Sequence, residues 1–251
     1  MTPMSDLTSI QRFHALANPA RFMALSEKIV APLAILTFAL IATGLYFALF
    51  VAPADYQQGE TVRIMYIHVP SAWLGMFGYM IMAGASAIAL IFRHPLADVC
   101  AKSAAPIGAA FAFITLVTGS LWGRPMWGAW WVWDARLTSM LILFFLYLGY
   151  IALWATIEEP VRAARAAAVL ALVGSINVPI VHYSVVWWNT LHQPASVFRI
   201  DGPQIASSML VPLLIMALGF TCFFVTLLLV RMRAEILRRR VRALRLAKAG
   251  A

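Results

Sequence analysis

Six long stretches of the chain contain no aspartate, glutamate, lysine or arginine. A helix of about 20 residues crosses the roughly 30 Å hydrocarbon core of a bilayer, so each stretch is long enough to span a membrane. Hydrophobic residues make up 63% of the sequence and charged residues 12%, whereas a soluble domain has about 45–50% and 25%. These values exclude an ordinary soluble globular protein. We therefore predict a single all-α integral membrane domain over 1–251 with six transmembrane helices, near residues 29–52, 65–92, 103–122, 137–157, 166–188 and 206–230.

The basic residues are divided unequally between the two sides of such a domain. Fifteen of the 19 lysines and arginines lie in the terminal segments or in loops on the same side as the termini, and eight of these are in the tail, residues 231–251. Cytoplasmic loops carry more lysine and arginine than loops that are translocated. We expect both termini to be cytoplasmic and the protein to be a multi-pass protein of the bacterial inner membrane. The basic tail then anchors the topology or contacts lipid headgroups rather than nucleic acid.

Tryptophan is concentrated on the opposite, periplasmic side. Five of the nine tryptophans lie at or beyond the end of the third predicted span, together with two arginines and an aspartate. An aromatic belt at the membrane interface is one interpretation, but a belt has its rings spread around helix ends, and here they crowd into one loop. We favour a platform for a flat, apolar ligand, because aromatic rings stack on flat π-systems. The residues concerned are Trp122, Trp127, Trp130, Trp131, Trp133, Asp134, Arg124 and Arg136.

Two histidines are expected on the same side as this loop. His68 lies at the start of the second predicted span and His192 lies just after the fifth, and each has tryptophan within a few residues. Two histidines beside an aromatic platform suggest the axial ligands of a haem iron, since imidazole is a common axial ligand. His182, inside the fifth span, is a rival candidate. Its role is either to satisfy the backbone of a helix kinked at Pro179 or to contact a substrate.

Four arginines lie on the tryptophan-rich side: Arg63, Arg124, Arg136 and Arg199. A guanidinium binds a carboxylate through two parallel hydrogen bonds, so each is a candidate for holding a haem propionate. We retain Arg63, Arg124 and Arg136 as residues of the site. The alternative is that Arg136 pairs with Asp134 and that the other arginines are solvated.

The residues around these histidines and tryptophans resemble a known family. The sequence is similar, over most of its length, to the CcmC group of the haem-handling proteins of cytochrome c maturation, whose marker is a tryptophan-rich outer loop written WWD. The tryptophan-rich loop is highly specific to this family. The segments that carry the resemblance are 52–59, 66–70, 105–108, 117–120, 127–138, 182–184 and 187–193.

The resemblance implies a haem-handling protein rather than an enzyme. In such a protein, His68 and His192 are the axial ligands of a transiently and non-covalently bound haem b at the periplasmic face, and the tryptophan-rich loop is its platform. Haem then passes to the periplasmic chaperone CcmE. The other implied partners are the ABC-type subunits CcmA and CcmB and the small membrane subunit CcmD. The two cysteines, Cys100 and Cys222, form no CxxCH motif for covalent haem attachment, which fits a carrier.

Two other classes of membrane protein remain as alternatives. A transporter or exporter of haem, or of another apolar substrate, needs no titrating residue in its spans, and the six stretches contain no aspartate, glutamate, lysine or arginine. A membrane cytochrome b subunit carries histidines at matched depths inside facing helices. Only His182 lies at such a depth, which disfavours this second alternative.

Overall fold

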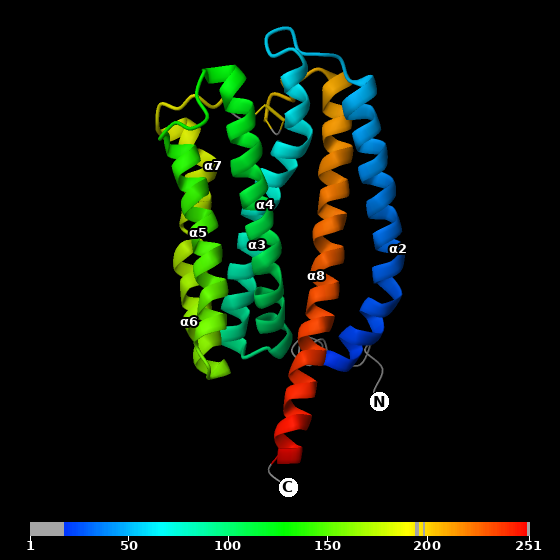
Figure 1. The fold of residues 1–251 in the computed structure, drawn as a ribbon, viewed down its shortest axis with the longest axis vertical. Coiled ribbons are helices and arrows are strands. Elements are labelled where there is room, and N and C mark those ends of the chain that lie inside the picture. Colours follow the sequence, from blue (N-terminus) through cyan, green and yellow to red (C-terminus); the bar gives the residue numbers. More distant parts are fainter. Residues whose placement is uncertain (1–17, 194–195, 198, 250–251) are drawn as a thin grey trace.

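The computed structural model describes residues 18–193, 196–197 and 199–249, and this part of the chain is helical with no β-strand. Six of its helices or helix pairs are long and apolar enough to cross a membrane, which confirms the predicted fold class. They run side by side as a bundle (Figure 1). The elements are α2 (Pro19–Tyr46), η2 (Phe47–Val51), η3 (Glu60–Ile64), α3 (Met65–Phe92), α4 (Pro95–Trp127), α5 (Ala135–Thr156), α6 (Pro160–Gly174), α7 (Asn177–Trp187) and α8 (Ser207–Ala249).

Helices α2, α5 and α6 begin after residues whose side chains satisfy free backbone amides. The Asn18 side chain accepts a hydrogen bond from the amide of Ala20 at 2.9 Å, and Asp134 does the same for Leu137 at 2.7 Å. The first helical residue of α2 is proline, whose missing N–H costs nothing there. Gly128, with a φ of 75°, ends α4 in the left-handed conformation that glycine adopts without strain. Local sequence therefore sets where these spans start and stop.

Two helices, α4 and α8, end well beyond the C-terminal limits of the apolar stretches that predicted them. Helix α4 continues to Trp127, so that Trp122 and Trp127 lie in a helix and only residues 128–134 connect α4 to α5. The tryptophan-rich segment is thus half helix and half loop. At the other end, α8 continues to Ala249, and the basic tail is the last part of this helix, which projects from the bundle in Figure 1.

The fifth span consists of two helices, because the chain breaks between α6 and α7 at Ser175 and Ile176. Pro179 consequently lies in the first turn of α7, where a missing N–H is tolerated. The carbonyl of Ser175, one turn before the proline, accepts from the amide of Val178 at 3.1 Å. The helical hydrogen bonding is thus interrupted one turn before Pro179, as in a helix kinked at a proline, and the Ser175 carbonyl is satisfied by the backbone rather than by a side chain.

The core is built where small residues let helices approach closely. Helices α3 and α4 pack along each other, and α2 packs on α8. At the centre, the fully buried Tyr147 of α5 donates a hydrogen bond from its hydroxyl to the carbonyl of Gly75 at 2.8 Å and meets Tyr79 edge to face, with ring centroids 4.9 Å apart. Gly108 of α4 has no side chain and leaves the space that the Tyr147 ring occupies. Close approach through small residues is typical of membrane helix packing.

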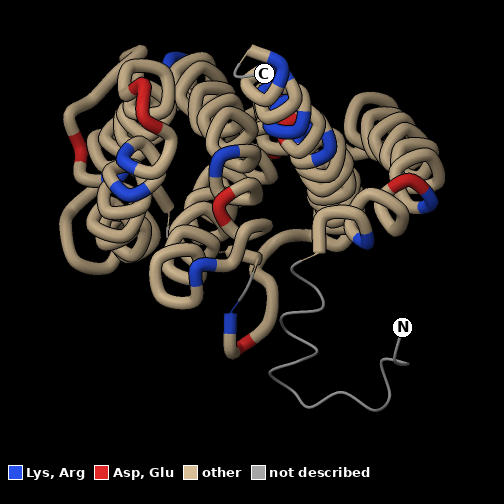
Figure 2. Tube along the Cα trace, turned by 90° about the horizontal axis from the view of Figure 1, so that it is seen from below, with Lys and Arg blue, Asp and Glu red and all other residues tan. Residues whose placement is uncertain are grey.

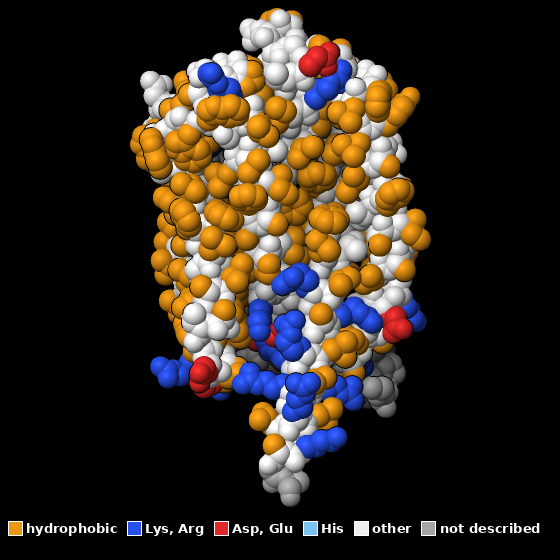
Figure 3. All heavy atoms as spheres, in the orientation of Figure 1, with side chains coloured by type: hydrophobic (Ala, Val, Ile, Leu, Met, Phe, Trp, Pro, Cys, Tyr) orange, Lys and Arg blue, Asp and Glu red, His pale blue; other side chains and the backbone are white. Residues whose placement is uncertain are grey.

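The two ends of the bundle differ in chemistry. Hydrophobic side chains cover the middle of the face seen in Figure 3, and lysine and arginine side chains gather at the end where α2 starts and α8 finishes. Figure 2, viewed toward this end, shows basic residues along the projecting part of α8. We call the end where α2 starts and α8 finishes the basic end. The opposite end, which holds the end of α4, residues 128–134 and the end of α7, is called the tryptophan end.

The contact between Gly108 and Tyr147 predicts a stability difference between two glycine substitutions. A Cβ atom at Gly108 would lie 2.0 Å from the Tyr147 hydroxyl oxygen, so Gly108→Ala displaces the ring and breaks its hydrogen bond. We expect a loss of about 2 kcal/mol in the free energy of unfolding, measured by denaturation in detergent micelles. Gly84→Ala in α3 is the matched control, since its Cβ atom meets nothing within 4 Å. Equal stability of the two variants would contradict this account of the core.

Candidate functional site

His68 lies in the first turn of α3, and its ring faces α4. Its Nδ1 atom is 3.0 Å from the hydroxyl oxygen of Thr118. That hydroxyl donates its own hydrogen to the carbonyl of Ile114 at 2.7 Å, so it accepts from His68. The hydrogen bond therefore places the proton of the neutral imidazole on Nδ1. The other ring nitrogen, Nε2, carries the lone pair.

Two neighbours on α4 shape the space around His68. A Cβ atom at Gly119 would lie 3.0 Å from Cε1 of the His68 ring, so only glycine leaves the ring its present position without a shift. The indole of Trp122 meets the imidazole at 76°, with ring centroids 5.6 Å apart. The Trp122 indole N–H in turn donates to the side-chain oxygen of Gln58 at 3.0 Å. The His68 ring is thus fixed by contacts on one helix.

His192 follows α7 and has the same arrangement with different partners. Its Nδ1 atom is 3.0 Å from Oδ2 of Asp134, whose other oxygen, Oδ1, accepts from the Leu137 amide and begins α5. Asp134 is buried, with 8% of its surface exposed. The indole of Trp127 lies against the His192 ring at 68°, with centroids 4.8 Å apart. A carboxylate–histidine pair of this kind fixes both ring orientation and tautomer.

The surroundings of His192 favour its neutral form. Burial lowers its pKa from the ordinary 6.5, and the positive charge of Arg136 lowers it further, while the negative charge and hydrogen bond of Asp134 oppose this. Burial is the largest of these effects, and the pKa is lowered overall. At neutral pH His192 is therefore uncharged, donates Nδ1–H to Asp134 and keeps its lone pair on Nε2.

The fold brings the two predicted histidines to the same end of the bundle. His68 comes from α3 and His192 from the segment after α7, and the two rings lie close enough to interact electrostatically. Each has Nδ1 held by an oxygen, an indole edge against the ring and a lone pair on Nε2. Such a pair can donate two imidazole nitrogens to a metal. Across residues 18–193, 196–197 and 199–249, no cluster of three or more histidine, cysteine, aspartate or glutamate side chains forms a metal site.

Each of the four arginines has a partner. Arg136 donates to the backbone carbonyl of His182 at 3.2 Å, and the Asp134 carboxylate is used by His192 and by the start of α5. The alternative pairing of Arg136 with Asp134 is therefore not formed as a hydrogen bond among the described residues. The remaining three form the following contacts: Arg124 with the Gly128 carbonyl, Arg63 with Glu60 and the carbonyls of Ala48 and Ala52, and Arg199 with Asp201.

The five tryptophans divide into two groups. Trp122 and Trp127, on the last turns of α4, contact the histidines. Trp130 and Trp133 have 57% and 75% of their surface exposed, and Trp131 packs edge to face on Trp133 with centroids 5.4 Å apart. The second group belongs to residues 128–134, which Ser120 ties to α4 by donating to the Trp130 carbonyl at 2.8 Å. Exposed aromatic rings thus follow, a few residues later in the chain, the two tryptophans that contact the histidines.

His182 is placed differently from the other two histidines. Its side chain is exposed on α7, and its ring meets that of Tyr183 edge to face at 4.7 Å. Sequence reasoning named His182 as a rival. It included residues 117–120 among the segments that resemble the family but gave no role to Thr118, which holds the His68 ring, or to Gly119, which leaves room for it. The signal that could have pointed to them is a hydroxyl and a glycine side by side within an apolar span.

Comparison with known proteins identifies the family. The family described as Heme exporter protein C matches residues 12–247. The chain belongs to this family, CcmC. A relative named Heme exporter protein C from Bradyrhizobium diazoefficiens is 62% identical over 235 residues, which cover 94% of this chain and 89% of that protein. The resemblance seen in the tryptophan-rich segment is confirmed.

More distant members of the family align over nearly the same length. The Heme exporter protein C of Escherichia coli strain K12 is 47% identical over 224 residues, 89% of this chain and 90% of that protein. A mitochondrial protein of Marchantia polymorpha, named as a ccmC-like protein of cytochrome c biosynthesis, is 46% identical over 211 residues, 84% of this chain and 89% of that protein. The CcmC similarity therefore includes the whole tryptophan end.

The carboxylate beside His192 predicts a measurable change in its titration. Asp134→Asn removes the charge that supports the imidazolium, so we expect the pKa of His192 to fall further below 6.5. Asparagine still caps a helix, so α5 keeps its start. Ring-nitrogen NMR of the ¹⁵N-histidine-labelled chain against pH measures the shift, with His192→Gln assigning the signal.

The matched control for this titration is Asp201→Asn, which removes an exposed carboxylate that pairs with Arg199. It should leave the pKa of His192 unchanged. An unaltered titration in Asp134→Asn would refute the pairing.

The lowered pKa of His192 also sets how stability depends on pH. As the pH falls below about 6.5, His192 takes up a proton in the unfolded chain before it does so in the folded chain. The contribution of His192 to stability therefore decreases as the pH falls below that value.

Proposed function

We propose that the protein binds haem b reversibly and non-covalently at the tryptophan end, with His68 and His192 as axial ligands, and passes it on during cytochrome c biogenesis. The names of the relatives support the haem-handling part of this proposal. The single observation that carries the site is the matched pair of imidazoles, each with its Nδ1 atom hydrogen-bonded and its Nε2 lone pair unused by that bond.

The residues present fit a haem. Two neutral imidazoles are the donor set of a six-coordinate, low-spin haem iron, and a bis-histidine site needs no third protein ligand. The His68 ring keeps its position beside α4 because position 119 has no side chain. The exposed rings of Trp130 and Trp133 offer apolar, aromatic surface to a flat molecule. When bound, haem supplies an iron centre with two axial positions and a large planar π-system.

The chain's own residues perform the positioning. Thr118 and Asp134 hold the two rings in one orientation and one tautomer, so that each Nε2 atom keeps a lone pair for donation. Trp122 and Trp127 pack against the ring edges and limit their rotation. Arg136 is the strongest candidate for a propionate partner, because its charge acts on His192. Arg63 and Arg124 stay candidates, with backbone carbonyls as their present partners.

The position of the two histidines favours transfer over electron transport. Both lie at one end of the bundle, His68 in the first turn of α3 and His192 beyond α7. A membrane cytochrome b holds its haem between facing helices inside the bilayer, whereas a surface site can be reached by a receiving protein. We propose that the tryptophan end faces the periplasm, that CcmE receives the haem there, and that CcmA, CcmB and CcmD form the ABC-type complex with this chain in the inner membrane.

The bis-histidine proposal predicts the absorption spectrum of the purified protein. We expect wild-type protein in detergent to show a low-spin, six-coordinate haem. His68→Ala and His192→Ala each remove one ligand, so each should give a five-coordinate spectrum or lower haem content several-fold. His182→Ala is the matched control, because its exposed ring lies at the same end and its backbone carbonyl is retained. Normal spectra in both ligand variants would reject the proposed ligands.

The excess of basic residues at one end predicts the orientation in the membrane. Single cysteines are introduced at Tyr56, which is 91% exposed at the tryptophan end, and at Leu246, which is 65% exposed near the end of α8. The parent has Cys100 and Cys222 replaced by alanine. In intact spheroplasts, a membrane-impermeant maleimide should label position 56 at once and position 246 only after permeabilisation. The reverse pattern would place the tryptophan end in the cytoplasm.

A further inference from the structure

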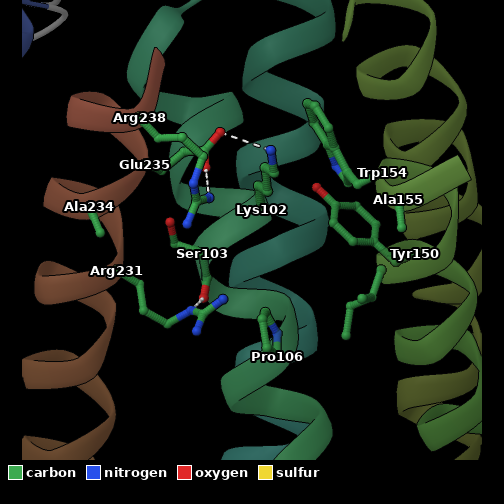
Figure 4. Close-up of a pocket in the computed structure, with 11 residues that line it drawn as sticks. Lys102, Ser103, Pro106, Tyr150, Trp154, Ala155, Arg231, Ala234, Glu235 and Arg238 are labelled. Carbon is green, nitrogen blue, oxygen red and sulfur yellow. Dashed lines mark hydrogen bonds and ion pairs between the residues drawn. The ribbon is translucent and has the colours of Figure 1, made fainter. Parts of the chain in front are cut away.

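A pocket of about 270 Å³ opens at the basic end, between α4, α5 and α8. Figure 4 shows side chains from all three helices pointing toward it. Its lining combines charged side chains with apolar ones. The charged and aromatic residues are Lys102 of α4, Tyr150 and Trp154 of α5, and Arg231, Glu235 and Arg238 of α8.

The charges in this pocket do not balance. Glu235, with 5% of its surface exposed, accepts from Lys102 at 2.8 Å and from both Arg238 and Arg239. One carboxylate therefore contacts three cations, of which, among the described residues, only Arg239 has a second carboxylate partner, Asp98 at 2.7 Å. Lys102 also lies over the Trp154 ring, 4.3 Å from its centroid, which holds the ammonium in place. The pocket keeps an excess of positive charge after these pairs are formed.

Arg231 carries the positive charge in this pocket that is not paired with a carboxylate of the described residues. Its Nε atom donates to the backbone carbonyl of Ser103 at 3.3 Å, and no carboxylate in the described part of the chain pairs with it. In Figure 4 its side chain extends from α8 toward Ser103 of α4. The Ser103 contact uses Nε and leaves both terminal nitrogens of the guanidinium. A guanidinium held in this way presents its fork to a carboxylate or phosphate.

The depth of Arg231 matches a phospholipid headgroup. Arg231 directly follows Val230, the last residue of a charge-free stretch. It precedes Arg238 by seven residues and so lies about 10 Å closer to the middle of the membrane along the helix. Pro106, Ile151 and Ala155 give the pocket apolar walls. Trp154 is an aromatic residue of the type found at headgroup level. The pocket thus joins cationic and apolar surfaces at the boundary between the apolar and basic parts of Figure 3.

We propose that this pocket binds the phosphate of an anionic phospholipid, with Arg231 forming two hydrogen bonds to the phosphate oxygens and Lys102 adding positive charge. The acyl chains extend along the apolar wall into the bilayer. The site is distinct from the general attraction between the basic tail and anionic lipid, because it depends on one arginine at one depth. Free phosphate has the same chemistry, so the experiment separates the two sources.

The test uses native mass spectrometry of the delipidated full-length chain in detergent. Dioleoyl phosphatidylglycerol is the anionic probe, phosphatidylcholine with the same chains is the neutral probe, and inorganic phosphate is the competitor. We expect the wild-type chain to bind phosphatidylglycerol about tenfold more tightly than phosphatidylcholine. Arg231→Gln should abolish this preference. Ala234→Glu, which adds a negative charge to the pocket wall without removing a contact, should do the same.

Arg245→Gln is the matched control, because it removes an exposed arginine of the same helix outside the pocket. It should change the preference by less than about twofold. An equal loss in Arg231→Gln and Arg245→Gln, or no loss in Arg231→Gln, would overturn the site. Displacement of the lipid by equimolar inorganic phosphate would overturn the lipid assignment in favour of a free phosphate. Unchanged thermal unfolding of the variants excludes misfolding as the cause.

Discussion

The carboxylate of Asp134 is the interaction on which the tryptophan end depends. One oxygen accepts the Leu137 amide and begins α5, and the other accepts Nδ1–H of His192 from a segment 58 residues further along the chain. A negative charge is favourable at a helix N-terminus, and burial strengthens its bond to the imidazole. The position of His192 is therefore tied to the start of a membrane-spanning helix rather than to the conformation of its own loop.

His68 depends in the same way on the packing of α3 against α4. Glycines allow this pair to approach closely: a Cβ atom at Gly75 would lie 3.4 Å from the backbone of Ala112, and one at Gly78 would lie 3.3 Å from Cα of Gly108. Gly119 in turn makes room for His68. The contacts that stabilise the core thus also bring the His68 ring within hydrogen-bonding distance of Thr118. In a bilayer, where apolar burial gives no advantage over lipid, such close contacts are a main source of helix association. The histidine pair is part of the fold and not an addition to its surface.

The number of membrane spans could be predicted from the sequence, whereas the side-chain contacts between helices could not. Six charge-free stretches were sufficient for the number of spans, because a membrane requires about 20 apolar residues for each. The helical state of Trp127 was not predicted, since Arg124 and Pro125 look like loop chemistry and only Gly128, with its positive φ, ends the helix. The partners of the two histidines lie 50 and 58 residues away. No local pattern encodes such pairings, although the histidines themselves stood out beside tryptophan.

The two proposed ligands are alike in geometry and unequal in chemistry. The Nδ1–H of His192 is held by a charged carboxylate, which increases the electron density that Nε2 can donate to a metal. His68 is held by a neutral hydroxyl that already donates to a backbone carbonyl, so its ring gains less. A carrier that must collect its cargo firmly and also release it benefits from such a difference, because the weaker ligand can exchange while the stronger one keeps hold. In the proposed carrier, His68 would therefore be the ligand that a receiving protein displaces, and His192 would be the one that retains the haem during transfer.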